Sequence, residues 1–204
     1  MLVTPSGLPS VVLDPEIQSA AGGRPSSVVQ TGDLAVVDFP GLQLSYVGRD
    51  AETYALSVSE SGASQPSERL KRVAQAAFER TLLVQQPKAV GFNVVRVGTL
   101  ADGDARLFLL GFVNEGVSRR LLDVGQPLNG AGLKLFYQDG IWAVTLTLEP
   151  HAKSAQQLVA SANFHTDEPS REQAQQVVGQ TDMLYASFVG RLAAVLDEVV
   201  RVRR

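Results

Sequence analysis

The chain has 204 residues, 45% of them hydrophobic, and its formal net charge at pH 7 is −3. This length and apolar content suffice for a sizeable core. The negative balance argues against a general nucleic-acid binder, because such proteins usually display a basic surface that neutralises phosphates. The sequence contains no cysteine, which excludes disulfides, thiolate catalysis and cysteine-ligated metal sites.

The first 30 residues predict a loosely ordered segment ahead of a single α+β domain over residues 31–204. Gly22, Gly23 and Pro25 lie in a small, polar stretch that is typical of a connector. The first 13 residues have no positively charged region and contain two prolines, so they are a poor signal peptide. No apolar run approaches the ~20 residues that a membrane-spanning helix needs. We therefore expect a cytoplasmic protein without a membrane partner.

Alternating apolar and polar residues predict one antiparallel sheet, mostly a meander, of about seven or eight strands. The segments 90–97 and 107–113 are apolar on both alternations, as is typical of central strands covered on both sides. The remaining strands are expected near 34–39, 42–46, 53–58, 133–147 and 156–164.

A β-hairpin is the clearest local signal, because Asp139-Gly140 between two alternating runs suits a tight type I′ turn. If these two residues form the loop, Tyr137 pairs with Trp142 on the apolar face. Phe136 and Ile141 then fall on the polar face. An apolar spot there would mark a second layer or a subunit interface.

Two helices are predicted to pack on the sheet, one over about 66–85 and a long C-terminal one over about 169–202. The first opens at a proline and ends before another. The second begins with an S-x-x-Q capping box at Ser170, and its apolar residues recur at steps of four and three. Gly179 and Gly190 lie about three turns apart, nearly on one line of this helix. They predict close packing on a sheet or helix, the alternative being a partner helix or ligand that approaches this line.

No catalytic constellation is found in the sequence, and we predict no catalytic residue, no metal site and no cofactor. His151 and His165 are the only histidines, and their spacing does not match a metal-binding motif. Motifs for phosphate binding and for a nucleophilic serine are also missing. The sequence therefore favours a protein that is not an enzyme.

The leading hypothesis is a non-catalytic binding or assembly protein of bacterial type, a homodimer or a binder of another protein. Its interface would be the sheet face around Phe136 and Ile141, or the C-terminal helix with Gly179 and Gly190.

Two other hypotheses stay open. One is a small-ligand carrier or a lyase/isomerase-like protein with an apolar cavity between the sheet and the C-terminal helix. Asn93, Arg96, Tyr137 and Tyr185 would supply the polar groups of its wall, although a polar pair in an apolar strand can also be hydrogen-bonded structure. The other is a nucleic-acid-associated accessory factor that uses the C-terminal arginines at 201, 203 and 204.

Overall fold

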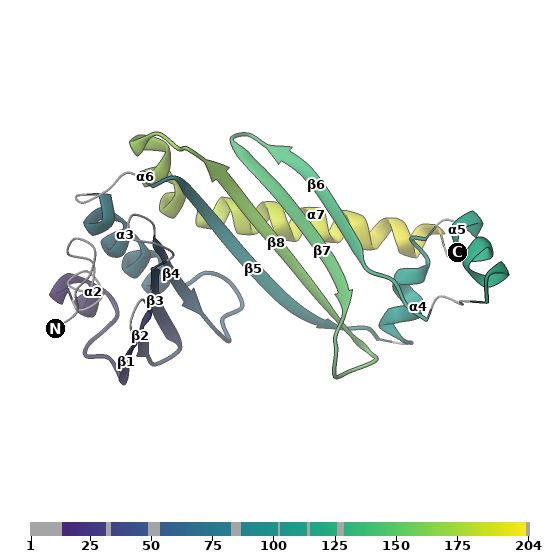
Figure 1. Ribbon diagram of the computed structural model, residues 1–204, viewed down its shortest axis with the longest axis horizontal. Helices are drawn as coiled ribbons and strands as arrows, with labels where there is room; N and C mark the ends of the chain where they lie inside the picture. The colour runs from purple at the N-terminus through teal and green to yellow at the C-terminus, as the bar shows by residue number, and fades with distance from the viewer. Residues whose placement is uncertain are drawn as a thin grey trace. The chain divides into compact units, whose positions relative to one another are not determined.

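The computed structural model describes residues 14–31, 34–48, 54–82, 87–101, 103–113, 115–125 and 129–202. These residues form two four-stranded antiparallel sheets, with strand orders β1-β2-β3-β4 and β5-β8-β7-β6 (Figure 1). The strands are β1 (Ser27–Thr31), β2 (Leu34–Phe39), β3 (Leu42–Gly48), β4 (Tyr54–Glu60), β5 (Ala89–Thr99), β6 (Leu133–Asp139), β7 (Trp142–Pro150) and β8 (Gln157–Asp167). The helices are α2 (Pro15–Ala20), α3 (Glu68–Leu82), α4 (Ala105–Leu110), α5 (Glu115–Asp123), α6 (Arg171–Gly179) and α7 (Thr181–Val202).

The predicted α+β class with antiparallel pairing is confirmed, but the prediction of one sheet is wrong. The strands divide into sheet 1 (β1 to β4) and sheet 2 (β5 to β8). The chain likewise forms two compact units, of which unit 1 comprises Met1–Val90 with Glu168–Asp182 and unit 2 comprises Gly91–Asp167 with Met183–Arg204. The predicted single domain over residues 31–204 therefore contains parts of both units.

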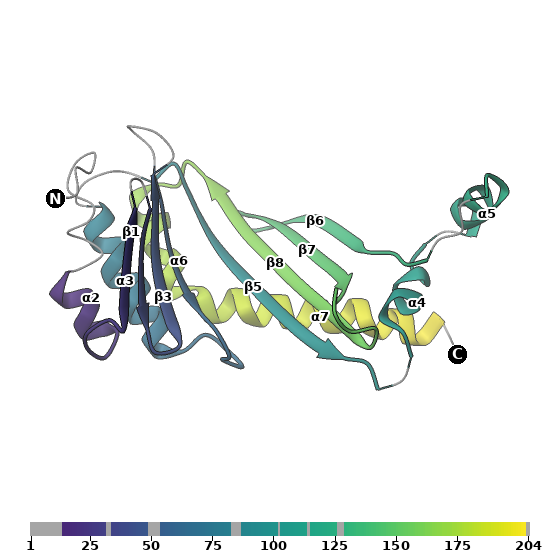
Figure 2. The same ribbon diagram turned by 60° about the horizontal axis from the view of Figure 1, so that its bottom comes forward.

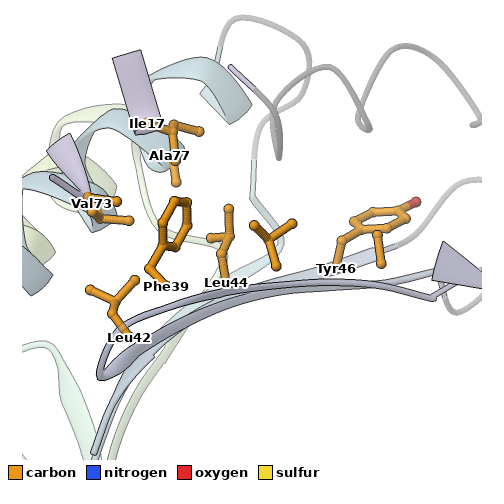
Figure 3. Close-up of a cluster of buried hydrophobic side chains, with 10 residues drawn as sticks. Ile17, Phe39, Leu42, Leu44, Tyr46, Val73 and Ala77 are labelled. Carbon is orange, nitrogen blue, oxygen red and sulfur yellow. The ribbon is translucent and has the colours of Figure 1, made fainter. Parts of the chain in front are cut away.

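The core of unit 1 lies between one face of sheet 1 and the helices α2 and α3 (Figure 3). Every second residue of β2 and β3 points into it, as the strand period of two requires. Its buried members are Ile17, Ala21, Ala35, Val37, Phe39, Leu42, Leu44, Tyr46, Val73 and Ala77. Full burial of one large apolar side chain stabilises the fold by roughly 1.5–3 kcal/mol. Ile17 belongs to the segment that was expected to be loosely ordered, of which residues 1–13 lie outside the described part of the chain.

In unit 2, sheet 2 turns one face toward α7 and leaves the other face open. Figures 1 and 2 show α7 running along the sheet on one side only. The buried residues of the covered face are Trp142, Val144, Leu146, Leu148, Leu158, Ala160, Ala162 and Phe164. Among the described side chains of α7, Leu184 and Phe188 are the buried apolar ones. The prediction that 90–97 forms a central strand covered on both sides is wrong, because β5 is an edge strand whose alternate residues are exposed.

The hairpin of β6 and β7 forms as predicted, but its register differs by two residues. Asp139 pairs with Trp142, and Tyr137 pairs with Val144. The loop therefore consists of Gly140 and Ile141. Gly140 has φ 60°, whereas Ile141 is not among the residues with positive φ. A positive φ at the first loop position alone is the type II′ pattern, so the glycine rather than the aspartate sets the turn. The shift of two residues leaves every side chain on its predicted face.

The apolar run 107–113, predicted as a strand, instead contributes to the helix α4. Asp104 precedes this helix as its N-cap, and its carboxylate accepts a hydrogen bond of 2.7 Å from the Arg106 N–H. A short apolar run fits a strand and a buried helix equally well by periodicity. The N-cap at Asp104 therefore favours the helix over the strand.

The C-terminal helix predicted over about 169–202 is two helices, α6 and α7, separated at Gln180. The capping box at Ser170 is confirmed, because Ser170 and Gln173 exchange side-chain to backbone hydrogen bonds. The Gln180 N–H bonds to the carbonyl groups of Gln176 and Val177, which tightens the last turn of α6. The mid-chain helix predicted over about 66–85 is present as α3, which spans Glu68–Leu82, and residues 83–86 lie outside the described part of the chain.

Candidate functional site

The open face of sheet 2 is the candidate functional site. We define it by ten side chains that alternate with the buried residues of β7 and β8 and the half-buried residues of β5 and β6, namely Asn93, Val95, Val97, Lys134, Phe136, Thr145, Thr147, Ser161, Asn163 and His165. Figure 1 views unit 2 from this side, and none of its described helices crosses in front of the sheet.

The strand register arranges these residues in rows across the sheet. Phe136 pairs with Thr145, which pairs with Asn163 on the next strand. The row continues to β5, because the Asn163 amide donates a hydrogen bond of 2.5 Å to the Asn93 side-chain oxygen. A second row runs through Lys134, Thr147 and Ser161. Hydroxyl and amide groups therefore occupy the middle of the face.

Apolar side chains lie at both edges of this polar middle. Phe136 on β6 is 72% exposed, and on β5 the exposed fractions are 61% for Val95 and 53% for Val97. The Lys134 ammonium lies 5.2 Å from the centroid of the Phe136 ring, within reach of a cation–π interaction. An exposed sheet face normally carries polar and charged side chains, so three large apolar residues here are a departure from that pattern.

Charge is sparse on the open face. Lys134 is its one permanently charged residue, and the acids on the same side of the sheet, Glu149 and Asp167, lie near strand ends. His165 lies at the margin, where its Nε2 is 2.7 Å from Oδ1 of Asp167.

The structure separates the four residues that were predicted to line a ligand cavity. Arg96 and Tyr185 lie together on the covered side of sheet 2, with Nη2 of the arginine 2.8 Å from the tyrosine hydroxyl. The Arg96 guanidinium also lies 5.1 Å from the centre of that ring. Tyr137 is on the opposite edge strand, and Asn93 is on the open face. Asn93 therefore does not share a wall with the other three.

Tyr137 belongs to a cluster of polar side chains that joins β6 to α7. The guanidinium of Arg191 covers its ring, and the Asp139 carboxylate accepts a hydrogen bond of 2.8 Å from the Ser187 hydroxyl. Sequence reasoning missed Asp139, Ser187 and Arg191. The available signal was the spacing of Ser187 and Arg191, which places both on one side of a helix.

The Tyr137 hydroxyl is buried and forms a hydrogen bond with none of the described residues. Burial raises the pKa of this phenol above its ordinary value of 10.0, and the negative charge of Asp139 adds to the rise, whereas the positive charge of Arg191 opposes it. The folded chain therefore holds the proton of this phenol to a higher pH than an exposed tyrosine would.

The four predicted interface residues are divided between the two units. Phe136 lies on the open face, and Ile141, in the adjoining turn, is 39% exposed. Gly179 belongs to unit 1 and Gly190 to unit 2. The close packing predicted for the glycines is wrong for the described chain, because a Cβ added at either position meets no atom within 4 Å.

The described part of the chain contains no group of three or more histidine, aspartate or glutamate residues placed to hold a metal ion. Among its helices, none combines the length and apolar character needed to cross a bilayer. The terminal arginines 203 and 204 lie outside the described residues.

Comparison of the chain with protein-family models, curated proteins and solved structures finds no match in any of the three.

Proposed function

We propose that this chain is a non-catalytic binding or assembly protein, and that the open face of sheet 2 is its contact surface. The observation that supports this proposal is the exposure of Phe136, Val95 and Val97 on a face with few charges. The centres of protein interfaces are depleted in charged residues and enriched in aromatic ones. Exposed apolar patches on soluble domains commonly mark interaction sites.

The polar residues of the face fit the same function. Thr145, Thr147 and Ser161 carry short side chains that lose little conformational entropy when a partner covers them. Long, flexible lysine and glutamate side chains in these places would oppose burial, both through their entropy and through desolvation of their charges. Covering the open face therefore costs little side-chain entropy, and the burial of its apolar residues favours binding.

Photo-crosslinking tests this function without assuming a partner. Phe136 is replaced by the photoreactive residue p-benzoylphenylalanine, and the full chain is irradiated in the cells that express it. Met183, which is 58% exposed on α7, is the matched control position. We expect one discrete adduct from position 136, identified by mass spectrometry, and no such adduct from position 183.

The variant Val95→Glu tests whether the adduct depends on the face. It places a charge on the same face but on another strand, so it should remove the adduct from position 136. An adduct from position 183 alone would transfer the contact to α7. No adduct from position 136, or one that survives Val95→Glu, would overturn the proposal.

A further inference from the structure

We infer that a second copy of this chain occupies the open face, docked face to face in a two-fold symmetric dimer. This inference rests on the proposed function of that face and names its partner.

The size of the face suits a dimer. Four strands about 4.8 Å apart, each contributing about 7–11 residues at ~3.3 Å per residue, give a flat area of roughly 450–700 Å² per copy. Its accessible area is larger, because side chains project from the sheet. Stable interfaces bury about 800 Å² per partner, so this face alone approaches the requirement.

The charges of the open face are compatible with contact between two copies of it. In a two-fold dimer the same patch lies on both sides of the interface, so a strongly charged patch would repel its copy. The open face carries one lysine, Lys134, and its margin carries the acids Glu149 and Asp167. Opposite signs are therefore present on each copy, and the centre is neutral.

The polar middle is also chemically self-compatible. Threonine and serine hydroxyls and asparagine amides both donate and accept hydrogen bonds. Thr145, Thr147, Ser161 and Asn163 can therefore each donate to, or accept from, the same residues of another copy. Two sheets that pack face to face typically align within about 30° and lie about 10 Å apart, which brings the inner side chains into contact.

Sedimentation equilibrium of the full chain over a dilution series tests this inference. We expect the wild-type chain to approach twice its mass of 21.8 kDa at high concentration and to dissociate on dilution. Val95→Glu and Phe136→Glu each place a carboxylate in the apolar contact. Each should weaken the dimer by about a hundredfold or more, because a carboxylate buried without a partner loses its hydration and gains nothing in return.

Two controls separate the loss of the dimer from the loss of the fold. Val29→Glu, at a valine that is 51% exposed on β1 in unit 1, should leave the dimer intact. The fluorescence of Trp142, the single tryptophan and a buried residue of unit 2, should be unchanged in both face variants.

The outcomes distinguish the two proposals. A wild-type chain that stays monomeric at every concentration, or a dimer that survives both glutamates, overturns the inference. If the chain is monomeric and position 136 still crosslinks to a different protein, the contact function stands and only the identity of the partner is wrong. If neither a dimer nor an adduct forms, both proposals fail.

Discussion

The guanidinium carbon of Arg191 lies 4.4 Å from the ring centroid of Tyr137, so a cation on α7 covers an aromatic ring on β6. The other edge of sheet 2 has the reverse arrangement, because there Arg96 of β5 lies over Tyr185 of α7. Phe188, which is buried, lies between Tyr185 and Arg191 in the sequence of α7. Two arginine–tyrosine pairs of opposite direction thus fix α7 to the two edge strands.

Arg191→Ala should destabilise unit 2 by about 1 kcal/mol. This value combines ~0.5–1 kcal/mol for a partly exposed cation–π contact with a small contribution from the ion pair. The ion pair is long, at 3.4 Å from Nη2 to Oδ2 of Asp139, and the arginine side chain is 47% exposed. Urea unfolding followed by Trp142 fluorescence measures the change in unit 2. Lys153→Ala, at an exposed lysine of the same unit, is the control and should have no effect; an equal midpoint for Arg191→Ala and the wild type would contradict the assignment.

Tyr137→Phe should leave stability unchanged or raise it by up to about 1 kcal/mol, because it removes a buried hydroxyl without a partner. The pKa of Tyr137 is raised in the folded state, so the folded chain holds this proton more tightly than the unfolded chain. The wild type should therefore lose stability as the pH rises from 10.0, the ordinary value, through the folded pKa.

Unfolding midpoints of Tyr137→Phe and the wild type at pH 7 and above pH 10 test both statements. The wild type should lose more stability than the variant at the higher pH. A variant that is clearly less stable at pH 7 would show that the hydroxyl has a partner.

Local signals in the sequence predicted single helices, strands and turns better than they predicted which of these elements pack against each other. The capping box at Ser170 and the turn at Gly140 each depend on residues only a few positions apart, and both are present in the structure. Periodicity showed that 90–97 and 34–46 are strands, but it is silent on which strands pair. The division into two sheets could therefore not be predicted, since it depends on contacts between segments that are far apart in the sequence.

The candidate site could be predicted only in part for the same reason. Phe136 was recognised as an exposed apolar residue because alternation within one hairpin assigns its face. Val95 and Val97 were read as buried, because a strand apolar on both alternations is usually covered on both sides. Their exposure follows from the position of β5 at the sheet edge with an open face, which the sequence does not encode locally.

Asp38→Asn should reduce the sensitivity of sheet 1 to acid. The Ser27 hydroxyl and the Gln43 amide donate hydrogen bonds of 2.6 and 2.8 Å to this carboxylate and lower its pKa below the ordinary value of 3.8. A lowered pKa contributes stability that is present above the unfolded pKa and is lost as the pH falls through the folded pKa. The wild type should therefore lose protection below about pH 4, and the variant should lose less.

Hydrogen exchange of the β2 amides at pH 7 and below pH 4, corrected for the intrinsic pH dependence of exchange, reports this local change. The amides of β7 in unit 2 supply the internal control, because their protection should respond to acid equally in both chains. An identical response of the β2 amides in wild type and variant would show that the two hydrogen bonds do not depend on the charge.

Gly91→Ala and Gly190→Ala should have opposite effects on stability. A Cβ at position 91 would lie 2.9 Å from the backbone oxygen of Phe164, and a backbone atom cannot move aside cheaply. We expect this substitution to cost about 1–3 kcal/mol, as overpacking usually does. At position 190 an added Cβ meets open space, so alanine should stabilise α7 by roughly 0.5–1 kcal/mol through its higher helix propensity.

Thermal unfolding of both variants, with mass measured by light scattering, separates the explanations for Gly190. If Gly190→Ala raises the melting temperature and leaves the mass unchanged, the line of α7 around it faces solvent. A lower melting temperature together with a smaller mass would mean that a second chain lies against this glycine, because within its own described chain nothing is close enough to clash. That result would move the contact surface from the open face of sheet 2 to the helix, which the spacing of Gly179 and Gly190 in the sequence had offered as the alternative.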